Sequence, residues 1–305
     1  MLNLHAPNLQ RPILEALYWV FILVCLAFGW FGWVFGWWIF VGLAMIGLGI
    51  LFYGGFVEPR LVRVMRYRLG DSTEEQSLRL VFVSDLHAGL KKGPGFYTKI
   101  AERIQALKPN LLVLGGDLVD ERASDAAALQ AIVELKLPLG VWFVLGNHDF
   151  FDDPNVVTSW MKSYGARELT NETLNFKLHE EQTLEIIGLD DSWYGTPALE
   201  LLKPAKKDLR IIVTHEPDLL LDIPEKNADL ILLGHTHGGQ ISLPGYGPLT
   251  GLPQAVPQWL DAGEKRWRDM RVIISRGLAE AGVRARLGSR PEIVVVDIYP
   301  TLKKE

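Results

Sequence analysis

The feature that most constrains this chain of 305 residues is a long segment near its N-terminus that has no charged side chain, from Ala16 to Val57. A helix needs only about 20 apolar residues to cross a bilayer, so this segment is long enough for two crossings. A cleaved signal peptide fits poorly, because its apolar core is shorter and ends in small residues. The sequence therefore predicts a membrane anchor over residues 1–57.

The middle of this segment, residues 29–38, reads Gly-Trp-Phe-Gly-Trp-Val-Phe-Gly-Trp-Trp. Glycine permits a turn, and tryptophan favours the membrane–water interface. We expect a hairpin of two transmembrane helices, Ile13 to Phe28 and Trp37 to Phe56. One strongly tilted span with an interfacial flank is the alternative, because hydrophobic length fixes neither tilt nor topology.

Basic residues follow the apolar segment, whereas the leading side carries only Arg11; the following residues are Arg60, Arg63, Arg66 and Arg68. Positive residues near span ends tend to stay in the cytoplasm, so the hairpin predicts an inner (cytoplasmic) membrane protein whose remaining chain faces the cytoplasm. The same arginines are equally well explained as the solvated face of a strand. We assign residues 58–77 to a basic juxtamembrane strand and linker.

Charge and cysteine content narrow the function. The net charge of −5 argues against a nucleic-acid-binding protein, which usually carries clustered Lys and Arg. The only cysteine, Cys25, lies inside the apolar segment, so the chain has no intramolecular disulfide and exposure to the cytoplasm is permitted.

Residues 78–305 have the pattern of an α/β domain. Short runs rich in Val, Ile and Leu predict buried strands at Leu78 to Ser84, Leu111 to Gly115, Val141 to Leu145, Leu209 to Val213 and Leu230 to Leu233. Helical patterns at Phe96 to Leu107 and Ala123 to Leu135 separate some of them, which predicts layers of helix and sheet. Later runs without long helices between them predict a second sheet, at Leu174 to Leu178, Leu184 to Leu189, Val272 to Ser275 and Ile293 to Ile298. The expected fold is a β-sandwich flanked by helices.

Five of the seven histidines lie in turns that follow predicted strands, at residues 84–87, 115–120, 146–149, 214–216 and 234–240. A single histidine after a strand is more often scaffolding than a ligand. Repeated on successive strand ends, together with Asp and Asn, such residues predict one site at the edge of the sheet.

The residue types in these turns select the chemistry. Imidazole, carboxylate and amide ligands without a thiolate suit Mn, Fe or Zn, of which we favour Mn. A carboxylate can bridge two such ions. Two ions about 3.5 to 4 Å apart clamp a phosphoryl group and lower the pKa of a bound water, which suits hydrolysis of a phosphate ester.

The turns resemble those of the calcineurin-like metallophosphoesterase superfamily, which read Asp-x-His, Gly-Asp, Gly-Asn-His, His and Gly-His-x-His in this order. The resemblance covers roughly Arg79 to Ile298. The form Gly-His-Thr-His-Gly-Gly-Gln at 234–240 is similar to a branch of small bacterial phosphodiesterases, often membrane-associated or exported.

This resemblance implies a role for each residue of the turns. The first ion would be held by Asp85, His87 and His237, and the second by Asn147, His215 and His235. Asp117 would bridge them. His148 would stabilise the transition state or protonate the leaving oxygen, with Asp120 placed to orient it. Family members that cut phosphoproteins have Arg after the second Asp, where this chain has Glu121, so a phosphoprotein substrate is not expected.

Three further features have two interpretations each. Asp149 is interpreted as a helix or turn cap rather than a catalytic group. Arg276 is a candidate for contacting substrate phosphate, although solvated charge is the default for it and for Arg284, Arg286 and Arg290. The apolar loop at residues 243–259 is expected to pack on the core rather than shelter acyl chains.

An anchored phosphoesterase works where lipids are, so we expect a phosphorylated or nucleotide-linked lipid substrate. UDP-2,3-diacylglucosamine ranks first, because membrane-bound enzymes of the superfamily that cut it in lipid A synthesis resemble this architecture. A broad phosphodiesterase for soluble nucleotides is the alternative, and a non-catalytic metal-binding membrane scaffold is an alternative of another class. The expected partners are the bilayer and the lipid substrate, with no nucleic acid and no obligate protein partner.

Overall fold

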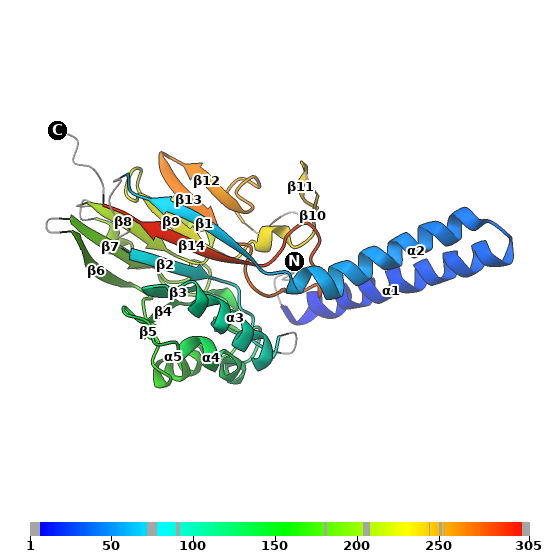
Figure 1. The fold of residues 1–305 in the computed structure, drawn as a ribbon, viewed down its shortest axis with the longest axis horizontal. Coiled ribbons are helices and arrows are strands. Elements are labelled where there is room, and N and C mark those ends of the chain that lie inside the picture. The colour runs from blue at the N-terminus through cyan, green and yellow to red at the C-terminus, as the bar shows by residue number, and fades with distance from the viewer. Residues whose placement is uncertain are drawn as a thin grey trace.

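The computed structural model shows a layered globular part with a long helical hairpin projecting from one end (Figure 1). The structure describes residues 7–71, 78–89, 92–179, 182–203, 208–243, 245–249, 252 and 254–300.

The hairpin is formed by α1, Pro7–Val34, and α2, Trp38–Phe52, which run antiparallel beside each other (Figure 1). Helix α2 continues into a π-helical turn, Tyr53–Val57, and a 3-10 turn, Glu58–Arg60. The expected turn over residues 29–38 is wrong in its extent. Gly29 lies inside α1, where an added Cβ would stand 3.3 Å from the Cβ of Ala44. This glycine therefore serves close helix packing rather than the turn.

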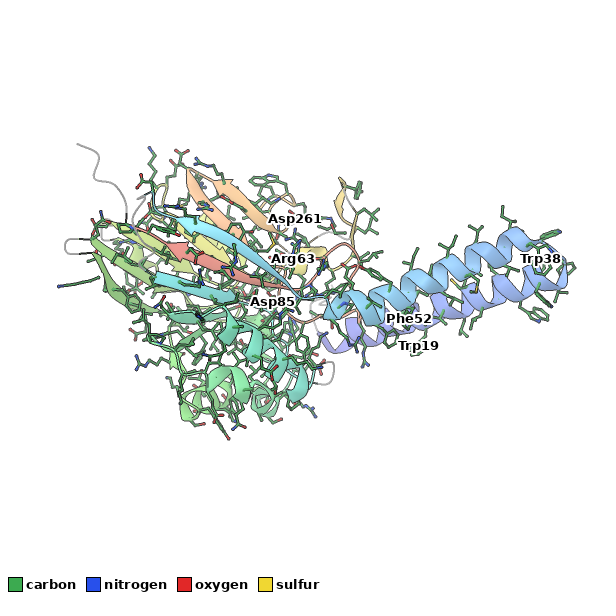
Figure 2. The ribbon with its side chains drawn as sticks, in the orientation of Figure 1. Trp19, Trp38, Phe52, Arg63, Asp85 and Asp261 are labelled. Carbon is green, nitrogen blue, oxygen red and sulfur yellow. The ribbon has the colours of Figure 1, made fainter. Side chains whose placement is uncertain are left out.

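Among the described residues, one helical segment is long and apolar enough to cross a membrane, Trp38–Arg60. The apolar stretch Tyr18–Val34 of α1 is shorter. Large side chains of the hairpin point outward along its length, including Trp19, Trp38 and Phe52 (Figure 2). The antiparallel pair of helices agrees with the predicted helical hairpin.

In the described part of the chain, twelve strands form two six-stranded sheets. The first sheet has the order β1, Arg63–Leu69; β14, Glu292–Ile298; β2, Leu78–Val83; β3, Leu111–Gly115; β4, Val141–Val144; and β5, Arg167–Glu168. The second has the order β12, Gly263–Trp267; β13, Met270–Ile274; β9, Leu230–Leu233; β8, Leu209–Val213; β7, Gln182–Gly188; and β6, Glu172–His179. A small hairpin pairs β10, Ser242–Leu243, with β11, Gly247–Pro248.

Helices cover the outer face of the first sheet: α3, Pro94–Ala106; a 3-10 helix, Ala123–Leu129, with α4, Gln130–Val133; and α5, Pro154–Ser163 (Figure 1). Shorter 3-10 helices are at Asn147–Phe150, Leu199–Leu202, Pro217–Leu221 and His237–Gly239.

Alternation along β2 shows how the layers are held. Leu80 and Phe82 point between the two sheets, where they join the core that contains Ile186 and Ile211. Val81 and its neighbours on the other face pack under the helices. Because both faces are buried, the strand reads as a continuous apolar run.

The two-sheet division predicted from the sequence is wrong in detail. Strand β14 inserts into the first sheet, between β1 and β2, instead of joining the second. Strands β8 and β9 belong to the second sheet, because β8 pairs with β7 while β4 pairs with β5. The predicted helix Ala123 to Leu135 is a 3-10 helix followed by one α-helical turn, in a segment that opens with Ser124 and Asp125, residues that compete for backbone hydrogen bonds.

Candidate metal centre

The C-terminal ends of five strands converge on one site. Parallel strands β2, β3 and β4 bring their turns to the same edge of the first sheet, and parallel strands β8 and β9 do so in the second. All seven predicted ligands lie together there, and none is more than 9% exposed: Asp85, His87, Asp117, Asn147, His215, His235 and His237.

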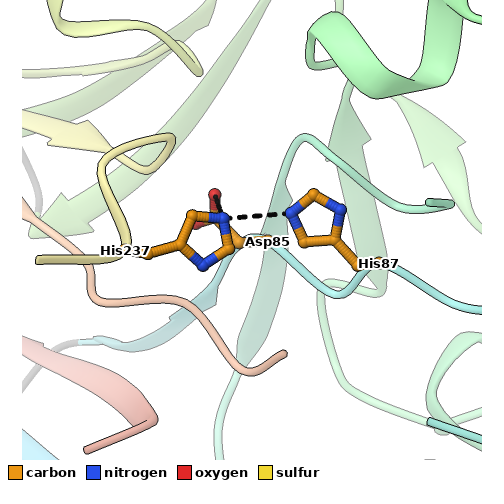
Figure 3. A group of neighbouring side chains, drawn as sticks. All are labelled: Asp85, His87 and His237. Atoms are coloured by element: carbon orange, nitrogen blue, oxygen red, sulfur yellow. Dashed lines mark hydrogen bonds and ion pairs between the residues drawn. The ribbon is translucent and has the colours of Figure 1, made fainter. Parts of the chain in front are cut away.

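The first group of side chains is Asp85, His87 and His237 (Figure 3). Nε2 of His237 lies 3.1 Å from Nε2 of His87 and 3.4 Å from Oδ1 of Asp85. Nδ1 of His237 lies 3.0 Å from the carbonyl oxygen of Ala279, which fixes the ring and leaves Nε2 facing the group.

The second group lies around Asn147, His215 and His235. Nδ1 of His235 is 3.1 Å from Oδ1 of Asn147. Oδ2 of Asp117 lies 3.1 Å from Nε2 of His215 and 3.4 Å from Nε2 of His87, so this one oxygen stands between the two groups. That is the position a bridging carboxylate needs.

Backbone strain is concentrated in the same residues. Positive φ angles occur at Asp85 (52°), His87 (42°), Asp117 (50°), His235 (69°) and His237 (51°). This region is sparsely populated by residues with a Cβ, and such outliers cluster at functional sites. These backbone conformations therefore cost free energy, and the packing of the surrounding strands must offset that cost to hold the side chains in place.

One glycine of the motifs allows close approach of the two sheets. A Cβ on Gly146 would stand 2.5 Å from Oδ1 of Asp117 and 2.8 Å from the His215 ring. Any side chain at this position would push apart the two groups that Asp117 joins.

Electrostatics make the site suitable for cations. Burial raises the pKa of Asp85. Burial acts in the same direction on Asp117, but the neighbouring His215 and His148 hold the pKa of Asp117 well below its usual range. Nε2 of His215 is buried without a hydrogen-bond partner while aimed at Asp117. A divalent cation would satisfy this nitrogen and the buried carboxylates together, so the residues fit the metal ions that the donor types imply.

His148 lies at the edge of both groups and is partly exposed. Its Nδ1 is 2.8 Å from the backbone carbonyl oxygen of Asp120 and 3.8 Å from the Asp120 carboxylate. That carboxylate lies closer to Nδ1 of His87, at 3.5 Å. Asp120 thus contacts His148 mainly through its main chain. Burial lowers the pKa of His148.

The cap interpretation of Asp149 is confirmed. Its carboxylate accepts hydrogen bonds from the backbone N–H groups of Leu118, Val119 and Gly146, at 2.9 to 3.0 Å. Burial and the charge of Asp117 raise the pKa of Asp149 to about 7. Asp149 therefore fastens the turn after β4 to the turn after β3.

The arginines near the C-terminus differ from one another. Arg276 forms an ion pair with Glu292 at 3.2 Å, beside the 237–239 turn, so its guanidinium has a protein partner; its contact with substrate stays a prediction. Arg286 is fully buried, contrary to the solvated default, and donates to the carbonyl oxygens of Arg276 and Ser289. Arg290 donates to the carbonyl of Leu61 at 2.9 Å.

Sequence reasoning missed two buried acids beside the site. Glu216 is fully buried and grouped with His215 and His235, and Asp191 is fully buried nearby. Burial, followed by a hydrogen bond with Asp191, raises the pKa of Glu216 well above its usual range. The signal was present in the sequence, since Asp190 and Asp191 follow a predicted strand as the ligands do.

The end of the hairpin is bonded to the loop that carries part of the site. Glu58 is 2% exposed and accepts a hydrogen bond from the backbone N–H of Ser289 at 2.8 Å. The Ser289 hydroxyl donates to the carbonyl of His237 at 2.6 Å. The carbonyl of Gly54 accepts from the N–H of Arg286 at 2.9 Å. The helical hairpin and the first group of side chains are thus joined by two hydrogen bonds in series, from Ser289 to Glu58 and from Ser289 to His237.

Fold and site together define a hydrolase domain whose buried His, Asp and Asn side chains, gathered at the ends of strands from both sheets, are suited to binding divalent metal ions. Residues 78–239 match the model of the calcineurin-like phosphoesterase family, and the chain belongs to this family. It is 30% identical over 257 residues to an uncharacterized metallophosphoesterase of Aquifex aeolicus, which covers 79% of this chain and 94% of that one. It is 28% identical over 258 residues to the uncharacterized metallophosphoesterase YkuE of Bacillus subtilis, covering 82% and 90%. The chain is accordingly a metal-dependent phosphoester hydrolase.

Among solved structures, the Haemophilus influenzae NAD nucleotidase NadN aligns with a TM-score of 0.42 and 14% identity, covering 66% of this chain and 50% of that one.

Proposed function

We propose that this protein is anchored in the inner membrane by its helical hairpin and hydrolyses a phosphate ester or pyrophosphate bond of a lipid at the membrane surface. A nucleotide-linked lipid such as UDP-2,3-diacylglucosamine is the first candidate, and Mn is the favoured metal. The catalytic domain would face the cytoplasm.

The observation that carries the membrane part of this proposal is the exposed apolar surface of the hairpin. Trp30 is 69% exposed, Ile39 is 72% exposed and Met45 is 67% exposed. Contiguous apolar surface of this kind is rare on soluble monomers and suits a lipid environment.

A second apolar surface supports a lipid substrate. In the loop at residues 243–259, Val256 packs on the core as expected, but Tyr246 is 76% exposed and Leu249 is 51% exposed. The β10–β11 hairpin that carries them lies near the base of the helical hairpin (Figure 1). This surface and the anchor would meet the same leaflet.

Each residue of the site has a defined task in hydrolysis. Asp85, His87 and His237 would hold one ion, Asn147, His215 and His235 the other, and Asp117 both. Bound metal ions supply charge that stabilises the phosphoryl oxygens and activates water. With Nδ1–H bonded to the Asp120 carbonyl, His148 would present Nε2 to the phosphoryl group, where its imidazolium form stabilises the transition state or donates a proton to the leaving oxygen.

The basic residues after the hairpin give less support to the sidedness than their sequence suggests. Arg63 pairs with Glu292 at 2.8 Å, and Arg66 lies 4.0 Å from Asp297, so both are also explained as the charged face of β1. The cytoplasmic orientation rests on the positive-inside tendency and is tested by labelling single cysteines introduced into the 35–37 turn after replacing Cys25.

The test of the chemistry is turnover of bis(p-nitrophenyl) phosphate by the full chain in detergent with added Mn. We expect Asp117→Asn and His148→Ala to lower turnover at least about 100-fold, because general acid–base groups alone contribute about 10² to 10⁴. Mn content should fall in Asp117→Asn and stay unchanged in His148→Ala. If both variants hydrolysed bis(p-nitrophenyl) phosphate as fast as the parent protein, the proposed mechanism would be wrong.

The lipid substrate is tested separately, by profiling metabolites of a strain that lacks the protein. Accumulation of one phosphorylated or nucleotide-linked lipid supports the proposal. Accumulation of soluble nucleotides instead would favour the alternative, a broad phosphodiesterase that is tethered only for location. The scaffold alternative is disfavoured, because the site contains the full set of predicted ligands together with His148.

A further inference from the structure

Two aromatic side chains that the proposed mechanism does not use lie beside the metal centre. Trp193 and Tyr194 follow β7 and are 39% and 49% exposed. The Trp193 ring meets the His235 ring edge-on, with centroids 4.7 Å apart. A large planar surface therefore stands next to a side chain predicted to bind the second ion.

The aromatic surface continues to the other side of the site. The Phe151 ring lies 4.4 Å from the His148 ring and 6.0 Å from the Tyr194 ring, measured between centroids. We call Phe151, Trp193 and Tyr194 the aromatic rim. The rim thus contacts both His235 and His148, so the group next to a phosphorus bound between them can lie against these rings.

The backbone beneath the rim is firmly held. One carboxylate oxygen of Asp191, which is fully buried, accepts hydrogen bonds from the N–H groups of Trp193 at 2.8 Å and Tyr194 at 2.6 Å. Glu216, also buried, accepts from the N–H of Ser192 at 3.0 Å. Asp191 and Glu216 therefore fix the loop that carries Trp193 and Tyr194, which gives these two buried acids a structural role beside the metal centre.

We propose that the aromatic rim binds the planar base of a nucleoside phosphate by stacking, with the phosphate at the metal centre. The inference rests on the proposed phosphoesterase function and narrows its substrate to compounds that carry a nucleotide. A nucleotide-linked lipid satisfies it, with its base on the rim and its acyl chains toward the hairpin.

A planar ring fits this surface better than an acyl chain does. Trp193 and Tyr194 follow the polar residues Asp190, Asp191 and Ser192 in their loop, and the indole N–H of Trp193 points to Asp218 at 3.4 Å. Rigid aromatic groups with polar edges stack on bases, whose faces are apolar and whose edges are polar. The extended apolar surface that an acyl chain requires lies elsewhere, on the hairpin and at Tyr246 and Leu249.

The test compares uridine monophosphate with ribose 5-phosphate, which share the sugar and the phosphate and differ in the base. Binding of each to the Mn-loaded full chain in detergent is measured by calorimetry. Stacking on aromatic side chains is worth about 1–3 kcal/mol per base, so we expect uridine monophosphate to bind about tenfold more tightly.

Substitutions in the rim then remove this preference. Trp193→Leu keeps an apolar group but loses the ring. We expect the ratio of the two dissociation constants to fall from about tenfold to about twofold, because one stacking contact is lost. Trp193→Phe should keep most of the preference. Tyr164→Leu, which removes an aromatic ring that stacks on Trp160 outside the rim, should leave the ratio unchanged.

Two results would overturn the proposal. Equal binding of the two phosphates by the parent protein would show that the rim does not recognise a base. Tighter binding of decyl phosphate than of uridine monophosphate, lost in Trp193→Ala but kept in Trp193→Leu, would assign the rim to an acyl chain. Failure of the proposed function is a different result, namely no turnover of bis(p-nitrophenyl) phosphate by Mn-loaded protein that still prefers uridine monophosphate.

Discussion

The helical hairpin and the globular part distribute the same kinds of side chain in opposite ways. In the hairpin, Trp30 and Ile39 are about 70% exposed, whereas Phe82 and Phe143 of the globular part are fully buried. The globular part buries polar groups instead, among them Asp85 and the other residues of the metal centre. Figure 2 shows the contrast, with Trp19 and Trp38 pointing away from the hairpin and Asp85 enclosed between the sheets.

This contrast teaches that the two regions are folded for different surroundings. Buried charges are tolerated only where they pair or bind a cation, which gives the globular part its site. A contiguous apolar surface such as that of the hairpin is rare on soluble monomers and is what the proposed membrane anchor requires. The border between the regions is narrow, and Glu58 lies on it.

The largest effect is expected from a change inside the globular part, Asp149→Ala. Three buried N–H groups would lose their acceptor, at about 1–3 kcal/mol each when left unsatisfied. We expect the thermal midpoint of the globular part to fall by several degrees and turnover to be largely lost, while the helical signal of the hairpin persists.

The matched control is Asp153→Ala, which removes the exposed N-cap of α5, where the carboxylate accepts from the N–H of Asn155 at 2.9 Å. An N-cap is worth about 1 kcal/mol, so this variant should lose little activity. A drop in stability equal to that of Asp149→Ala would show that Asp149 is an ordinary cap.

A smaller effect is expected at the border, from Glu58→Ala. Loss of the acceptor for the Ser289 N–H should loosen the loop that orients His237. We expect the affinity for Mn to fall by no more than about tenfold. Loss of a group that orients a metal ligand directly typically lowers metal affinity about 10–100-fold, and Glu58 acts one hydrogen bond further away. Calorimetric titration with Mn measures this change.

Glu58→Gln keeps an acceptor oxygen and should restore most of the Mn affinity, whereas Glu102→Ala, an exposed change on α3, should have no effect. If Glu58→Ala bound Mn as the parent does, the hairpin would be a tether and no part of the site.

The smallest effect on catalysis is expected from a change in the hairpin, Ile46→Lys. Ile46 is 61% exposed, so turnover of bis(p-nitrophenyl) phosphate in detergent should be unchanged. Insertion should suffer, because a charge at the centre of a membrane helix costs about 2.5 to 3.5 kcal/mol. Cell fractionation should show less protein in the membrane than for Ile46→Leu. Lower turnover without any change in membrane content would contradict the division of roles between the regions.

Sequence by itself determined the ligands and the apolar segment, because both depend on local pattern. A short apolar run followed by Asp-x-His or Gly-Asn-His marks a strand and the turn after it, so the residues of the centre could be named before their positions in space were known. The fold class followed from the same alternation, and Asp149 was recognised as a cap from its place after a strand.

Tertiary structure alone decided how distant segments meet. Strand β14 lies between β1 and β2 although more than 200 residues separate it from either, and no local pattern states which sheet a run of Val and Ile will join. For the same reason the Asp120 carboxylate faces His87, Glu58 reaches Ser289, and Tyr194 meets Phe151 although the two follow different strands. Local sequence specifies the secondary structure and the side chains of each segment. The packing of the two sheets decides which of these side chains come into contact.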